Sequence, residues 1–241
     1  MKSVVDVVGE IRKSQSANFH RGKSWEYCYA FFRNHEKFSD NEKLLDFAAL
    51  HLGFFLASWG MFRGSSFLLQ KDYKFYISIV EILTDSEYNR LWDIDFLNKS
   101  KEQNQDVDLL FRLKEELENK IIENNTKDKD GGHEMNLIIT KIIMATMGCV
   151  PGYDKYFKGG LKNWLNEKEK FQKEEIRRYL NFKKDSFKNL LNLVNENNKL
   201  KNICDSKQYL KKTRVEYPPM KLLDLFFWLI GREMVISKVS P

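Results

Sequence analysis

One stretch constrains the fold more than any other: the residues from Phe47 to Phe62 carry no charge, and a helix built from them is apolar on nearly every face. A helix that is apolar all round is either buried in a protein core or placed in a membrane. A membrane-spanning helix needs about twenty such residues, and this run is shorter and contains His51 and Ser58. The stretch therefore predicts a buried central helix of a folded core, with no membrane contact.

The flanking residues predict where this helix begins and ends. Ser39, followed three positions later by Glu42, matches a capping box and places the first turn near Asp40. After the apolar run, Gly64 offers the left-handed conformation that commonly ends a helix. The helix is therefore expected to extend from about Asp40 to Arg63.

The end of this helix is also a candidate phosphate-binding corner. Arg63, Ser65 and Ser66 bring a guanidinium and two hydroxyls to the start of whatever helix follows. Such groups bind phosphate together with helix N-terminal amides. The alternative is that Arg63 only complements the negative end of the helix dipole.

The rest of the chain also favours helices. The 241 residues contain only four prolines and twelve glycines, which leaves few turns for a fold of many strands. Residues 134–147 and 220–231 form two further strongly apolar segments. We therefore predict an all-α fold, a single globular domain of about eight to ten helices around two or three fully buried apolar helices.

Several amphipathic segments and one loop complete this prediction. Apolar residues recur at helical spacing in residues 3–13, 23–38, 72–83, 106–124 and in two or three segments of 159–194. The polar residues 125–133 form the best candidate for a subdivision of the domain.

Charge is unevenly distributed along the chain. The net charge is +6, and residues 158–214 contain sixteen Lys or Arg against seven Asp or Glu, a balance of +9 that leaves −3 for the remainder. A basic helical C-terminal half of this kind suggests an anionic partner such as nucleic acid, and a solvated surface is the alternative. The candidate nucleic-acid-binding residues on the outer faces of these helices are Lys173, Arg177, Arg178, Lys183, Lys184 and Lys188.

Cysteine usage and motif content limit the chemistry. Cys28, Cys149 and Cys204 are scattered and form no CxxC pair, which favours reduced thiols in a cytoplasmic protein over a zinc site or a disulfide scaffold. The N-terminus lacks an apolar run of signal-peptide length. No phosphate-binding glycine loop and no paired-histidine motif occurs, so we expect neither a cofactor nor a metal.

One pair of residues could carry catalysis. Lys141 is a lone charge in an apolar helix, and Asp154 follows the turn Val150–Tyr153 at the start of the next helix. Desolvation can turn such a lysine into a nucleophile, with the carboxylate assisting. The alternative is a lysine that extends its amine to solvent and an aspartate that caps a helix.

Three fragments carry a resemblance: Ser58 to Ser65, Thr140 to Asp154, and Lys221 to Trp228. They resemble a group of bacterial helical proteins of unknown function, which implies no activity. The layout of the second fragment is also similar to that of helix-hairpin-helix DNA glycosylases. That resemblance implies that Lys141 attacks the sugar carbon and that Asp154 assists, although residues 135–139 lack the family's glycine-rich hairpin.

Three functions stay open from the sequence. The first is a nucleic-acid-associated binding protein that uses the basic surface. The second is a lyase or glycosylase-like enzyme that acts on a nucleic-acid base or sugar. The third is a structural module that binds a protein partner or forms a homo-oligomer.

Overall fold

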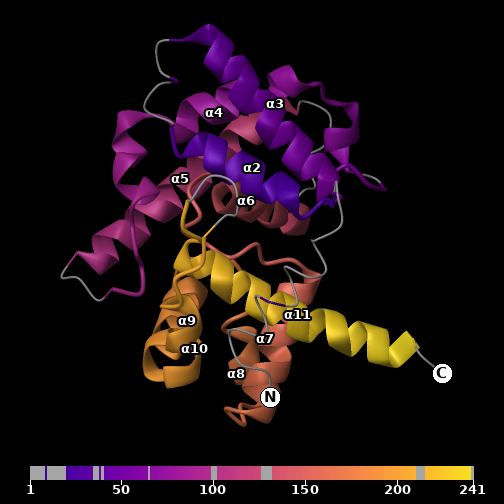
Figure 1. Cartoon of the computed structure of the whole chain (residues 1–241), viewed down its shortest axis with the longest axis vertical. Coiled ribbons are helices and arrows are strands. Elements are labelled where there is room, and N and C mark those ends of the chain that lie inside the picture. Colours follow the sequence, from indigo (N-terminus) through magenta and orange to yellow (C-terminus); the bar gives the residue numbers. More distant parts are fainter. Residues whose placement is uncertain are drawn as a thin grey trace. The chain divides into compact units, whose positions relative to one another are not determined.

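The computed structural model describes residues 9, 20–34, 38, 41–64, 66–98, 102–125, 132–209 and 215–239. Within these ranges the chain forms helices and no β-strand, and the pair Tyr209–Glu216 makes an isolated antiparallel bridge. The predicted all-α fold is confirmed (Figure 1). The helix predicted for residues 3–13 lies outside the described residues, apart from Gly9.

The chain divides into two compact units. The N-terminal unit comprises Asn18–Ile94 and Lys101–Gly148, and the C-terminal unit comprises Met1–Ala17, Asp95–Ser100 and Cys149–Pro241. One boundary falls at the end of the buried apolar helix, between Gly148 and Cys149. The subdivision expected at residues 125–133 falls largely on residues 126–131, which lie outside the described residues.

The N-terminal unit is built on one fully buried helix and one amphipathic helix. Its α-helices are α2 (Lys23–Phe32), α3 (Glu42–Ser58), α4 (Ile77–Leu83), α5 (Gln103–Asn124) and α6 (Gly132–Thr146), with 3-10 turns η2 (Phe67–Gln70), η3 (Tyr73–Tyr76) and η4 (Ser86–Trp92). As predicted, α5 buries one stripe, which consists of Val107, Leu110, Leu113, Leu117 and Ile121. Helix α6 is buried on every side from Ile138 onward and ends at Thr146, two residues before Gly148, whose φ is +73°.

Helix α3 departs from its predicted burial and boundaries. Phe47, Leu50 and Phe54 share one face and are 55%, 44% and 67% exposed, so the prediction that this helix is buried all round is wrong for that face. The expected N-terminal cap also differs, because Asn41 accepts the Leu44 amide at 3.2 Å and the helix starts at Glu42. Ser39 and Asp40 lie outside the described residues.

The C-terminal end of α3 differs for a clear physical reason. Gly60 has φ +80° and its amide bonds to Ala57, while the Met61 amide bonds to the Leu56 carbonyl. These two bonds form a Schellman motif, in which a residue with positive φ, usually glycine, ends the helix. Gly60 therefore ends the helix one turn before Gly64, and Arg63 lies in the following turn.

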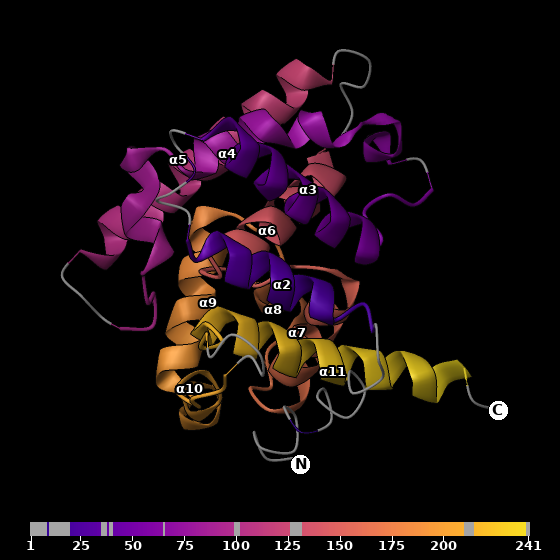
Figure 2. The same ribbon diagram turned by 45° about the horizontal axis from the view of Figure 1, so that its top comes forward.

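The C-terminal unit is organised around two long helices that cross. It contains α7 (Lys155–Glu167), α8 (Lys173–Arg177), α9 (Lys184–Glu196), α10 (Asn198–Cys204) and α11 (Pro219–Val239). Pro219 occupies the first turn of α11, as its fixed φ predicts. Residues 220–227 of α11 are buried on every side of the helix, and α7 packs along this helix (Figure 2).

The hydropathy of the helices bears on whether any of them could span a membrane. None of the helices within the described ranges combines the length and the apolar character that a transmembrane segment requires.

Candidate nucleic-acid interface

Two glycines allow α7 and α11 to approach until their backbones touch. A Cβ atom on Gly160 would overlap the carbonyl oxygen of Phe227, and one on Gly231 would overlap the carbonyl oxygen of Tyr156. Because any larger residue would force the backbones apart, this crossing depends on glycine at both positions. The close crossing fixes one wall of a surface groove.

The groove has a volume of about 660 Å³ and lies between α7, α8 and the C-terminal half of α11. We call it the basic groove. Its lining combines four cationic side chains, two amides and an apolar floor: Lys155, Lys162, Lys173, Arg177, Asn163, Asn166, Ile176, Leu180, Met234 and Val235, together with Gly159 and Gly231. No carboxylate occurs among these lining residues.

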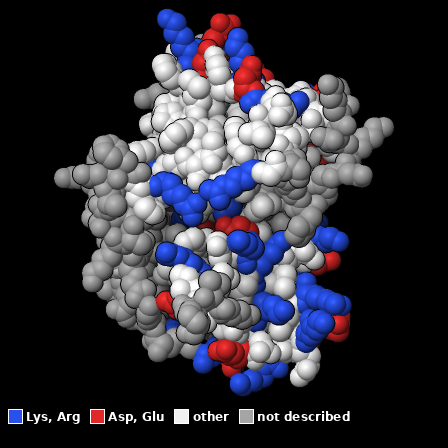
Figure 3. Space-filling model, turned by 90° about the vertical axis from the view of Figure 1, so that its right-hand side faces the viewer, with Lys and Arg blue, Asp and Glu red and all other residues white. Residues whose placement is uncertain are grey.

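The cationic side chains of the groove face solvent. Lys155, Lys162, Lys173 and Arg177 are all exposed. Arg177 contacts the carboxylate of Glu174 at 2.8 Å, but both side chains are mostly exposed, and such pairs contribute little stability. The guanidinium is therefore available to exchange this partner for a phosphate. Figure 3 shows one face of the molecule, and blue side chains outnumber red ones in its lower half, where Figure 1 places α7, α8 and α11.

The groove contains part of the predicted basic surface and adds residues that the sequence did not single out. Lys173 and Arg177 line it, whereas Arg178, Lys183, Lys184 and Lys188 do not. Three of these four are exposed and Lys188 is half-buried. Lys155 and Lys162 were missed because a count of charge along the chain does not indicate which cations of different helices line one groove.

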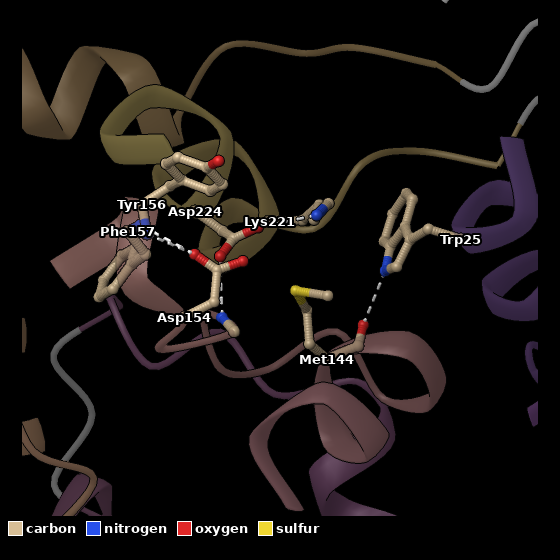
Figure 4. Close-up of polar contacts among 8 residues, drawn as sticks. Trp25, Met144, Asp154, Tyr156, Phe157, Lys221 and Asp224 are labelled. Carbon is tan, nitrogen blue, oxygen red and sulfur yellow. Dashed lines mark hydrogen bonds and ion pairs between the residues drawn. The ribbon is translucent and has the colours of Figure 1, made fainter. Parts of the chain in front are cut away.

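A buried polar contact holds the turn that leads into α7. The amide of Gly152 donates to Oδ1 of Asp224 at 2.9 Å, and Oδ2 of Asp224 lies 2.8 Å from Nζ of Lys221 (Figure 4). Lys221 and Asp224 are each about 1% exposed. Two residues of α11 thereby fix the backbone before α7, although the sequence indicated only a resemblance at this motif.

Asp154 occupies the N-cap of α7. Its Oδ1 accepts the amides of Tyr156 and Phe157, each at 3.0 Å (Figure 4). This is the capping role that was the alternative to catalysis. Burial lowers the pKa of Lys158, one turn later, and the Asp154 carboxylate opposes that shift.

Lys141 is buried within the N-terminal unit. It is 1% exposed, and its Nζ lies 5.0 Å from the centroid of the Trp59 ring. A cation held over an indole face is a stabilising contact. Asp154 belongs to the other unit, so the catalytic pair stays a prediction.

The residues of the predicted phosphate-binding corner differ in their exposure to solvent. Arg63 is exposed, whereas Ser66 is 4% exposed and its hydroxyl has no hydrogen-bond partner among the described residues. Ser65 lies outside the described residues. The corner therefore also stays a prediction.

The cysteines and acidic residues define no metal centre within the described ranges, where no three His, Cys, Asp or Glu side chains group as metal ligands. Cys28, Cys149 and Cys204 are buried free thiols. No family model, curated protein or solved structure matches this sequence, so the function has to be inferred from the residues of the chain themselves.

Proposed function

We propose that this protein binds nucleic acid through the basic groove. The observation that carries the proposal is the arrangement of four exposed cationic side chains around one groove with no carboxylate in its lining. Lysine and arginine at these positions can each neutralise one backbone phosphate and release its counterion. The two asparagines of the groove add hydrogen bonds to phosphate or sugar.

The surroundings of the groove extend this charge. Arg178, Lys183 and Lys184 follow Arg177 in the chain and are exposed. Salt screens electrostatic interactions beyond about 8 Å at physiological ionic strength. These cations therefore act mainly on the part of a polyanion that extends beyond the groove and passes close to them. Contacts of this kind position the backbone and carry no sequence information.

The test is fluorescence anisotropy of labelled single- and double-stranded oligonucleotides, titrated with the full chain between about 50 and 200 mM salt. We expect saturable binding that weakens steeply with salt. The double variant Lys162→Glu/Lys173→Glu should lower affinity at least about tenfold, because two phosphate contacts become repulsions.

A matched control separates the groove from net charge. Lys43→Glu/Lys74→Glu changes the charge by the same amount on exposed lysines of the N-terminal unit. It should retain most of the affinity. Equal losses in both double variants, or no binding by the wild-type chain at low salt, would overturn the proposal.

A further inference from the structure

A second cleft lies on the other side of α8 and has the opposite character. It has a volume of about 430 Å³, within the range of small-ligand sites, and it is formed by the α7–α8 connection, the residues after α8 and one face of α9. We call it the amide cleft. Its lining is Glu169, Phe171, Tyr179, Asn189, Asn192, Leu193, Glu196 and Asn197.

The charges of the amide cleft exclude phosphate. Glu169 and Glu196 are its two ionisable carboxylates, and its lining contains no lysine or arginine. A phosphate in this cleft would meet only like charge at these positions, which is unfavourable. The cleft therefore suits an uncharged part of a nucleic acid, a sugar or a base.

Aromatic rings provide a surface on which a base can stack. The rings of Phe171 and Tyr179 are 5.7 Å apart between centroids and tilted by 41°, and both side chains are half-buried. This spacing leaves no room for a third ring between them, so a base would stack on an outer face of the pair. Base–aromatic stacking contributes about 1 to 3 kcal/mol per base.

The polar groups of the cleft are partly fixed before any ligand arrives. Oε1 of Glu169 accepts the indole N–H of Trp164 at 3.2 Å and the side-chain amide of Asn197 at 2.8 Å. Asn197 is itself fixed, because its Oδ1 caps α10 by accepting the amides of Lys199 and Leu200. A prearranged hydrogen-bonding surface loses less conformational freedom on binding, which favours recognition of one ligand edge.

The residues that flank α8 line the cleft, and residues of α8 itself line the groove. Phe171 and Tyr179 lie two residues before and two residues after α8, whose Lys173 and Arg177 line the basic groove. A nucleic-acid strand that crosses α8 can therefore have phosphates at Lys173 and Arg177 while one of its bases turns toward the cleft.

We propose that the amide cleft takes one unpaired nucleobase of the nucleic acid that the basic groove binds, an inference that rests on the proposed function. In a duplex the Watson–Crick edge is occupied, so the base must come from a single strand or a loop. The carboxylates accept hydrogen bonds, and guanine offers two parallel donors on that edge. The cleft should therefore prefer guanine to adenine or cytosine, which each offer one amino group, and should bind thymine or uracil least.

The experiment compares a labelled oligothymidylate with the same strand carrying one central guanine, titrated with the full chain and read by fluorescence anisotropy. The guanine should increase affinity about tenfold, the effect expected of one bidentate base contact. A duplex of the guanine-containing strand should lose this gain. The same measurement with the corresponding RNA strands tests whether the sugar matters.

Two exposed carboxylates provide the matched variants. Glu196→Gln removes a carboxylate of the cleft, and Glu167→Gln makes the same charge change on α7 outside the lining of the cleft. Both should bind oligothymidylate equally, but only Glu196→Gln and Tyr179→Ala should lose the guanine preference. The salt dependence that reports the groove should persist in all three.

The outcomes distinguish the two proposals. Salt-dependent binding without a guanine preference, or a preference that survives both Glu196→Gln and Tyr179→Ala, overturns the cleft and leaves the groove intact. Weaker binding of the guanine-containing strand than of oligothymidylate also overturns it. Failure of the wild-type chain to bind either strand overturns the groove and the cleft together.

Discussion

The two surfaces next to α8, the basic groove and the amide cleft, differ in charge. The basic groove presents exposed cations of α7 and α8 beside the backbone crossing of α7 and α11. The amide cleft presents carboxylates and amides. The carboxylate of Glu169 is fixed by hydrogen bonds from Trp164 and Asn197. The affinity of a surface for phosphates depends on the number of its cations. The recognition of a base depends instead on how rigidly the polar side chains that contact it are positioned.

The largest expected effect tests whether the groove depends on the helix crossing. Gly160→Ala should destabilise the protein by at least about 3 kcal/mol, because the new Cβ would overlap the backbone of α11. Gly159→Ala is the adjacent control, since its nearest non-local atom would be Gly231 Cα at 3.8 Å. This control should be neutral or slightly stabilising, because alanine favours helix over glycine.

Chemical denaturation measures the stabilities, and thiol labelling locates the change. Burial raises the pKa of Cys149 to about 12 and also raises that of Cys204. Both thiols of the C-terminal unit should therefore react slowly in the wild type and faster in Gly160→Ala. Equal stability of the two alanine variants would contradict the close crossing.

The next effect concerns the buried pair that fixes the turn before α7. Asp224→Ala should cost about 3 kcal/mol, because it leaves the buried amine of Lys221 without its carboxylate. Replacing both residues, as Lys221→Met/Asp224→Leu, should recover most of this loss. Denaturation midpoints test this, and a double variant no more stable than Asp224→Ala would count against the ion pair.

A smaller effect sharpens the description of the amide cleft. Asn197→Ala should cost about 1 kcal/mol through the lost cap of α10 and should also weaken the guanine preference, since Glu169 loses a donor. Asn197→Asp keeps a capping oxygen but places a second carboxylate beside Glu169. Asn197→Asp should therefore be more stable than Asn197→Ala but should still lose the guanine preference. If both variants kept that preference, the hydrogen bond from Asn197 would not be needed to position Glu169.

Single cations of the groove should have modest effects. Lys155→Gln should lower affinity severalfold and reduce the slope of log affinity against log salt by about one, because one phosphate contact is lost. Lys43→Gln is the control on the N-terminal unit and should leave the slope unchanged. The same slope in both variants would mean that Lys155 makes no phosphate contact.

The smallest expected effect separates binding from catalysis. If the protein is a binder, Lys141→Met should leave nucleic-acid affinity unchanged, because this side chain is buried in the N-terminal unit. The wild-type chain should also form no borohydride-trapped adduct with DNA that contains abasic sites. An adduct that disappears in Lys141→Met would instead support the glycosylase-like hypothesis.

Sequence reasoning performed best where a pattern is local. The stripe of α5, the buried helix α6 and the proline at the start of α11 follow from spacing and side-chain type alone. It was less accurate for α3, because an apolar composition reveals how much of a helix can be buried but not which faces the rest of the fold covers. Phe54, 67% exposed, illustrates this limit.

The two surfaces differ in how far the sequence could foresee them. Lys173 and Arg177 could be identified from a basic amphipathic segment, but Lys155 belongs to another helix, α7, and lines the same groove only in the folded chain. No sequence pattern predicts the amide cleft, because asparagines in helices also occur on ordinary solvated surfaces. Only the folded chain shows that Phe171 and Tyr179 share a cleft with Asn192 and Glu196.

Tyr153 has a consequence for how this chain can change over evolution. Its backbone adopts a left-handed conformation, with φ +45°, while its buried ring packs 5.1 Å from Phe157 and 5.4 Å from Phe182 between centroids. Glycine would relieve the backbone and leave a cavity, whereas another aromatic residue would fill the space and keep the strained backbone. A non-aromatic residue at this position therefore loses packing, and an aromatic one leaves the backbone strain in place. Wider change at the turn requires its aromatic neighbours to change with it.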